Sequence, residues 1–84
     1  MTQQDMEETI ARRLRQRRLE LGMKLAEVGA AAGVSDKRVC KFESGENGVS
    51  AALLYRLANA LRTPMSYFFV APNQGPNDAH LASL

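Results

Sequence analysis

Three cationic side chains, Lys37, Arg38 and Lys41, lie within five residues of one another. They follow Gly33, which suits a tight turn, and Ser35, which suits a helix N-cap. On a helix, residues three or four positions apart share a face. Lys and Arg on an exposed helix face can donate hydrogen bonds to phosphates and to base edges in the DNA major groove. The stretch therefore predicts a DNA-binding helix.

The elements that must position these side chains are all helical. Apolar spacing predicts an all-α bundle of five short helices, and no stretch has the alternation of a strand. The helices are expected over residues 5–21, 25–32, 36–44, 51–61 and 64–69. The second and third form a helix-turn-helix, with Ser35 and Ser50 as expected N-caps. Residues 1–71 are expected to form one domain, and residues 72–84, rich in Pro, Asn and Gly, a flexible tail.

Charge is divided unevenly along the chain, although the net charge is only +2. Residues 12–41 hold nine Lys or Arg side chains and three carboxylates, a net charge of +6. The other residues hold two cations and six carboxylates, a net charge of −4. This polarity favours one face toward a polyanion, although a solvated helix face is the plainer interpretation for most arginines of the first helix.

Composition excludes several classes of protein. No run approaches the roughly 18 consecutive apolar residues of a membrane span, and the N-terminus lacks the pattern of a signal peptide, so a cytosolic protein is expected. With a single cysteine, Cys40, and a single histidine, the chain can form neither an internal disulfide nor an ordinary zinc site. No nucleophile and base, paired carboxylates or phosphate-binding glycine loop is evident. We therefore expect no enzyme and no cofactor.

The motifs, taken together, resemble the XRE or HTH-3 family, the helix-turn-helix domains of the phage repressor and Cro type. The resemblance covers about residues 10–69. The matching segments are Leu14-Arg15 with Arg18, Gly22-Met23-Lys24-Leu25, Val28-Gly29, Gly33-Val34-Ser35, Val39, Phe42-Glu43-Ser44-Gly45 and Leu57-Ala58-Asn59-Ala60-Leu61. It implies a lambda-repressor-like bundle.

The resemblance implies different roles for similar charges. It places a mostly buried ion pair between the first and third helices at Arg18 and Glu43. The implied contacts to base edges are Asp36, Lys37 and Lys41. It also places a backbone-contacting loop at Asn47. Ser35 at the start of the third helix, Arg38 and Lys24 are the other expected phosphate contacts, with a second base reader as the alternative for Arg38. Because Lys donates to guanine O6 and N7 and Asp accepts from cytosine N4, a site with G·C pairs is expected.

Three positions depart from the family pattern. Leu25 stands where the family usually has a Gln that anchors the second helix to phosphate, and Lys24 replaces the usual Ser or Thr cap. Gly29 replaces the usual Ala at a close helix crossing, which preserves the approach at about 1 kcal/mol in helix propensity. Cys40 is interpreted as a small filler residue, with redox sensing as the less favoured alternative.

The expected function is a sequence-specific regulator of transcription that binds double-stranded DNA without catalysis. One reading helix covers few base pairs, so a homodimer on a palindromic operator is expected, with half-sites about 34 Å apart. The candidate dimer interface is apolar and lies near the end of the domain: Met65, Tyr67, Phe68 and Phe69.

Other roles of the same fold stay open. The chain could be the controller protein of a restriction-modification system, or an antitoxin whose tail folds onto its toxin. A protein-interaction module without DNA readout is a further alternative, because fold alone does not establish function.

Overall fold

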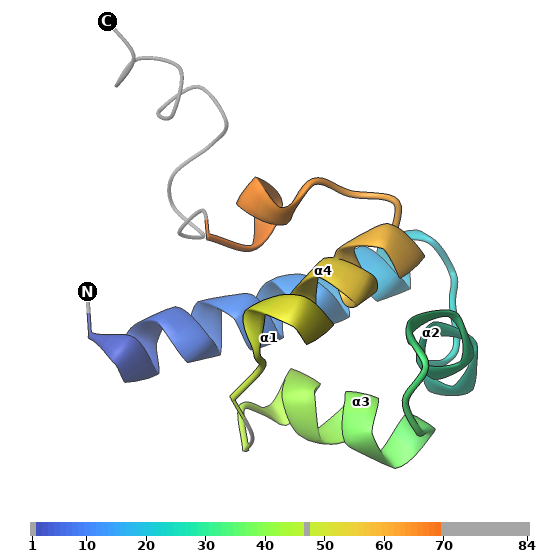
Figure 1. Ribbon diagram of the computed structural model, residues 1–84, viewed down its shortest axis with the longest axis horizontal. Coiled ribbons are helices and arrows are strands. Elements are labelled where there is room, and N and C mark those ends of the chain that lie inside the picture. Colours follow the sequence, from blue (N-terminus) through green and yellow to red (C-terminus); the bar gives the residue numbers. More distant parts are fainter. Residues whose placement is uncertain (1, 47, 70–84) are drawn as a thin grey trace, which may run out of the picture.

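The computed structural model describes residues 2–46 and 48–69. These residues form four α-helices and one 3-10 helix, without strands (Figure 1). The elements are α1 (Gln3–Glu20), α2 (Leu25–Ala32), α3 (Asp36–Ser44), α4 (Ala51–Ala60) and η1 (Met65–Phe69). The all-α class is confirmed, but the fifth predicted helix is a short 3-10 helix. The predicted tail, residues 72–84, lies outside the described residues.

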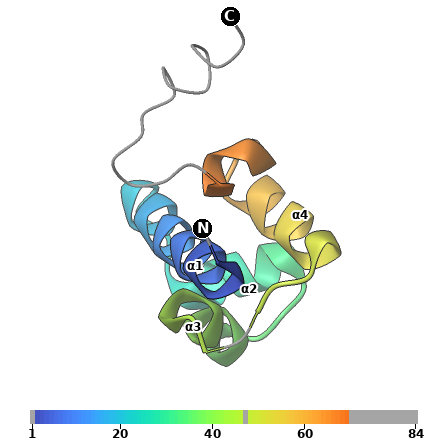
Figure 2. The same ribbon diagram turned by 90° about the vertical axis from the view of Figure 1, so that its left-hand side faces the viewer.

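The helices enclose a single apolar core. Figure 2 shows α3 below α1, with α4 beside α1 and η1 on the side away from α3. Seven large side chains are almost fully buried and come from all five elements or their ends: Leu14, Val28, Val39, Phe42, Leu57, Leu61 and Phe68. The apolar stripe of each helix thus faces its neighbours, which leaves the polar stripe of α3 available for another partner. No helix among the described residues has the length and apolar character needed to cross a membrane.

Side-chain caps fix the start of three helices. The hydroxyls of Thr2, Ser35 and Ser50 accept hydrogen bonds from the backbone N–H of the third residue of α1, α3 and α4, respectively. The N-caps predicted at Ser35 and Ser50 are confirmed. Helix α2 starts differently, because a lysine side chain has no acceptor for a backbone N–H. Instead, the Lys24 N–H donates to Glu27 Oε1 at 2.7 Å.

The turn between α2 and α3 is packed tightly against α2 at Gly29. A Cβ atom at this position would lie 2.5 Å from the backbone oxygen of Val34, closer than real contacts allow. The same segment is tied to α2 by a hydrogen bond from the Val34 N–H to the Gly29 oxygen at 2.9 Å. Gly29 therefore allows the close approach that sets the angle between α2 and α3.

An ion pair joins α1 to α3. Arg18 Nε donates to Glu43 Oε2 at 2.7 Å, and Arg18 Nη2 donates to Glu43 Oε1 at 3.0 Å. The two side chains are only 12% and 7% exposed. Hydrogen bonding to Glu43 raises the pKa of Arg18 above its ordinary value, and Arg18 Nη1 also donates to the Met23 oxygen at 3.0 Å. One guanidinium thus fixes α1, α3 and the α1–α2 connection together.

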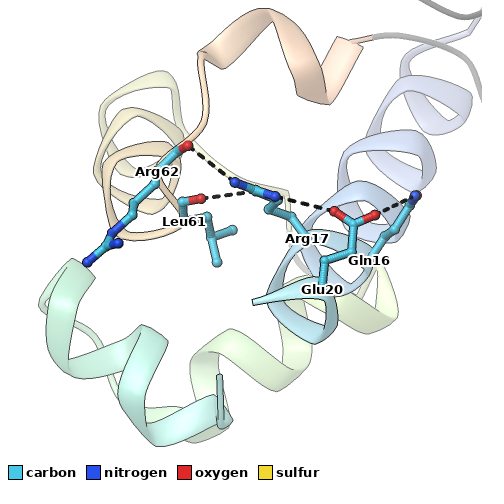
Figure 3. Close-up of polar contacts among 5 residues, drawn as sticks. All are labelled: Gln16, Arg17, Glu20, Leu61 and Arg62. Carbon is cyan, nitrogen blue, oxygen red and sulfur yellow. Dashed lines mark hydrogen bonds and ion pairs between the residues drawn. The ribbon is translucent and has the colours of Figure 1, made fainter. Parts of the chain in front are cut away.

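The neighbouring arginine binds the other side of the bundle. Figure 3 shows Arg17 reaching the end of α4, where its Nε donates to the Leu61 oxygen at 3.2 Å and its Nη2 to the Arg62 oxygen at 3.5 Å. Its third contact is an exposed ion pair with Glu20 at 3.5 Å. Arg62 has a positive φ of 53°, which turns the chain from α4 toward η1. Arg17 therefore satisfies carbonyls that the end of a helix leaves without partners.

Breaking the Arg18–Glu43 pair from one side should destabilise the fold more than removing both charges. We expect Arg18→Met to cost about 3 kcal/mol in the free energy of unfolding, because Glu43 then stays buried without its partner. Adding Glu43→Leu should recover a large part of this loss. Chemical denaturation of the two variants measures the difference. Equal losses in both would contradict the pairing.

Alanine at position 29 should destabilise the protein although it favours helix. Overpacking against a backbone oxygen costs about 1–3 kcal/mol, whereas the gain in helix propensity is about 1 kcal/mol. We therefore expect Gly29→Ala to lower the free energy of unfolding, as measured by denaturation. The matched variant Ala30→Gly, at an exposed position of α2, measures propensity alone. If Gly29→Ala instead raised the free energy of unfolding, the Val34 backbone would be shown to shift away from the added Cβ without cost.

Candidate nucleic-acid interface

Helix α3 presents two different faces. Val39 and Phe42 are buried in the core. Lys37, Arg38 and Lys41 are exposed on the opposite side. Figures 1 and 2 show α3 at the edge of the molecule, where the other described helices leave its outer side uncovered. The structure therefore brings the cations of the predicted reading helix onto one open surface.

These cations surround a shallow hollow. It has a volume of about 220 Å³ and is lined by Ser35, Lys37, Arg38 and Lys41. The guanidinium carbon of Arg38 lies 5.7 Å from the centre of the Phe42 ring, in cation–π range. No carboxylate lines this hollow. A concave, cationic surface of this kind suits an anionic or acceptor-rich ligand.

Asp36 and Ser35 form the start of α3. Asp36 Oδ1 accepts the Lys37 N–H at 2.8 Å, which holds the carboxylate at the positive end of the helix dipole. Ser35 Oγ accepts the Arg38 N–H at 3.1 Å, so its hydroxyl proton stays available as a donor. Asp36 thus contributes hydrogen-bond acceptors at the start of α3, beside the donors of Ser35 and the three cations. A ligand at this surface can therefore be bound through its acceptors and through a donor.

Of the other two predicted phosphate contacts, Lys24 and Asn47, the structure describes only Lys24. Lys24 is exposed at the N-cap of α2, and Leu25 is partly buried against the core. Asn47 lies outside the described residues. Cys40 is exposed on α3, so it does not fill the core as the filler interpretation expects. The thiol is next to the predicted base contact Lys41 in sequence and is not a packing residue.

The candidate dimer residues divide into buried and exposed ones. Phe68 is fully buried in the core of the single chain, which removes it from the expected interface. The turn of the 3-10 helix explains this, because Phe68 faces inward while Phe69, the next residue, is 44% exposed. Met65 and Tyr67 are half-buried, and the Arg13 guanidinium carbon lies 4.8 Å from the centre of the Tyr67 ring. Exposed apolar surface in η1 is therefore concentrated at Phe69.

Sequence reasoning missed the contacts between arginine side chains and other parts of the fold. Arg17 binds backbone carbonyls more than forty residues away, and Arg13 stacks on an aromatic ring of η1. Neither has a local signal, since the partners are distant in sequence. The count of nine cations over residues 12–41 therefore overstates the charge that is free to bind a ligand.

Comparison with known proteins identifies the architecture. Residues 14–68 match the model of the HTH_3 helix-turn-helix family. An uncharacterised HTH-type transcriptional regulator of Sinorhizobium fredii is 43% identical over 60 residues, which cover 71% of this chain and 42% of the relative. The chain spans about half the length of the curated relatives it matches.

Two solved structures are similar over most of their own length. The P22 c2 repressor in complex with a synthetic operator has a TM-score of 0.67 and 28% identity, covering 71% of this chain and 91% of that one. The restriction-modification controller protein C.AhdI from Aeromonas hydrophila has a TM-score of 0.72 and 26% identity, covering 77% and 97%. A third similar structure, FeII HppE in complex with its substrate, has a TM-score of 0.70 and 26% identity, and the match covers 37% of that chain. The fold therefore occurs in proteins of different kinds and does not define an activity by itself. With a family model matching most of its length and relatives of the same type, the chain belongs to the HTH_3 helix-turn-helix family.

Proposed function

We propose that the protein binds double-stranded DNA sequence-specifically and regulates transcription by binding, without catalysis. The observation that carries the proposal is the open cationic face of α3, with its hollow lined by Ser35, Lys37, Arg38 and Lys41. The operator complex of the similar P22 c2 repressor supports it. A helix held from behind by a buried core and an ion pair can enter the major groove without first being ordered.

Within this proposal, the three base-reading side chains are Asp36, Lys37 and Lys41. The two lysines donate to guanine O6 and N7, and Asp36 accepts from an amino group such as cytosine N4. The Asp36 carboxylate uses Oδ1 to accept the Lys37 N–H, which leaves its second oxygen for this purpose. Ser35, Arg38, Lys24 and Asn47 are the proposed phosphate contacts, which set the register of α3 on the duplex.

A homodimer on a palindromic operator is part of the same proposal. A single short helix reads few base pairs, so two copies on half-sites about 34 Å apart gain both affinity and specificity. Phe69 supplies exposed apolar surface beside the half-buried Met65 and Tyr67. These three residues of η1 form the proposed contact between copies.

A narrower role as a restriction-modification controller is the second candidate. The similarity to the controller protein C.AhdI, with a TM-score of 0.72 and 26% identity, supports it. The two roles share the DNA-binding mechanism. Genes for a methyltransferase and an endonuclease beside this one would favour the controller.

Removing the proposed readers should weaken specific DNA binding. A duplex is first selected from a random pool at two salt concentrations, because backbone attraction falls with salt while a preferred motif persists. We expect Lys37→Ala with Lys41→Ala to weaken binding to that duplex at least tenfold, since each base contact contributes about 1–3 kcal/mol. Fluorescence anisotropy measures the dissociation constants.

The matched control is Lys24→Ala, a proposed phosphate contact. It should weaken binding to all duplexes by a similar factor and reduce the slope of log K against log salt by about 1. Unchanged binding of the Lys37 and Lys41 double variant would contradict readout by α3 and favour a protein-interaction module.

A charge at Phe69 should separate the proposed dimer. We expect Phe69→Asp to yield monomers by light scattering, because the half-exposed ring loses its apolar contact and gains a charge that an interface would bury. Tyr55→Asp, at an exposed aromatic residue of α4, should leave the mass unchanged. If Phe69→Asp keeps the mass of the parent protein, copies associate through another surface.

A further inference from the structure

The five arginines of α1 fall into two groups. Arg13, Arg17 and Arg18 contact an aromatic ring, carbonyl oxygens and a buried carboxylate of other elements. Arg12 and Arg15 are exposed, and neither forms a hydrogen bond or ion pair within residues 2–46 and 48–69. These two guanidiniums have no structural role in the described fold. They are free to bind an anionic group.

Arg12 and Arg15 border the same hollow as an exposed leucine. The hollow lies between α1 and the end of α3, has a volume of about 540 Å³, and is lined by Arg12, Arg15, Gln16, Leu19 and Glu43. Leu19 is 53% exposed. Arg12 and Arg15 are exposed as well. Figure 2 shows α3, α4 and η1 below α1 and to one side of it, so that the opposite side of α1 faces no other described helix.

The acidic residue in the lining does not cancel the charge of the face. Both oxygens of Glu43 accept hydrogen bonds from Arg18, so this pair is neutral as a unit. Glu8 lies one turn before Arg12 and borders the neighbouring hollow, which marks the acidic end of the helix face. Residues 12–19 therefore combine two free cations with one apolar side chain.

We propose that this face, formed by Arg12, Arg15 and Leu19, docks an acidic segment of a partner protein. Carboxylates bind guanidiniums with paired hydrogen bonds, and an apolar side chain of the same segment covers Leu19. DNA fits the face less well, because phosphates offer nothing to a half-exposed leucine. The hollow also meets α3 at Glu43, near its C-terminal end, whereas the proposed base readers are residues 36–41. Partner and DNA can then bind at the same time.

A defined peptide tests the proposal without DNA. The probe is a synthetic amphipathic peptide of Glu, Ala and Leu, with its glutamates and leucines on one helical face, titrated into isotope-labelled protein. We expect saturable NMR shift changes centred on residues 12–19. Arg15→Glu should weaken binding at least tenfold, because it places like charges opposite each other. Leu19→Ser should weaken it as well.

Controls separate this site from general attraction to a basic protein. Lys24→Glu makes the same change of charge at an exposed residue that does not line this hollow, and it should leave the affinity for the peptide within about twofold. Thermal unfolding of each variant shows that the fold is intact. Equal binding of a peptide with Lys in place of Glu, shift changes confined to residues 36–41, or no saturable binding would overturn the proposal.

A DNA titration covers the alternative ligand. Arg12→Ala with Arg15→Ala should leave the affinity for the selected duplex unchanged. Weaker DNA binding with a smaller salt slope would assign both arginines to the phosphate backbone and overturn the proposal. The peptide titration contains no DNA, so its result can be interpreted even if the protein does not bind DNA.

Discussion

The geometry of this small fold depends on one ion pair, between Arg18 of α1 and Glu43 of α3. Helix α3 has only nine residues, too few to form a stable helix alone in water. Val39 and Phe42 bury one side of it, but apolar contacts are not directional and tolerate rotation. A bidentate pair fixes direction as well as distance. The third hydrogen bond of Arg18, to the Met23 oxygen, extends this constraint to the chain that enters α2.

Arg18 is one of several cations that serve the fold, so they are not free to bind a ligand. Nine cations lie within residues 12–41, and counting them suggests one broad surface for a polyanion. In the structure, Arg13, Arg17 and Arg18 serve the fold through a ring, three carbonyls and a carboxylate. Of the six cations that remain, three line a hollow on α3 and two line a hollow on the outer side of α1. The sixth, Lys24, is exposed at the N-cap of α2. Net charge therefore locates the basic half of the protein without saying which of its side chains meet a ligand.

What the sequence predicts well is local. The bounds of α2 and α3 and the caps at Ser35 and Ser50 follow from neighbouring residues, and the structure has them as expected. The Arg18–Glu43 pair was expected only from the resemblance to a family, because its partners are 25 residues apart. The 3-10 form of η1 and the inward side chain of Phe68 were missed, since packing on α1 and α4 decides both. The carbonyls that Arg17 binds carry no sequence signal at all.

Leu25 and Gly29 show how departures from a family pattern can strengthen one property at the expense of another. Gly29 costs helix propensity, yet the backbone oxygen of Val34 occupies the space that any side chain would need. Leu25 lacks the amide that would reach a phosphate, but its side chain packs partly against the core. Both residues favour a compact helix-turn-helix over contacts made by α2. Under the proposed function, DNA affinity then has to come from the cations of α3 and from pairing of two copies, which places the burden of recognition on Lys37, Lys41 and the surface around Phe69.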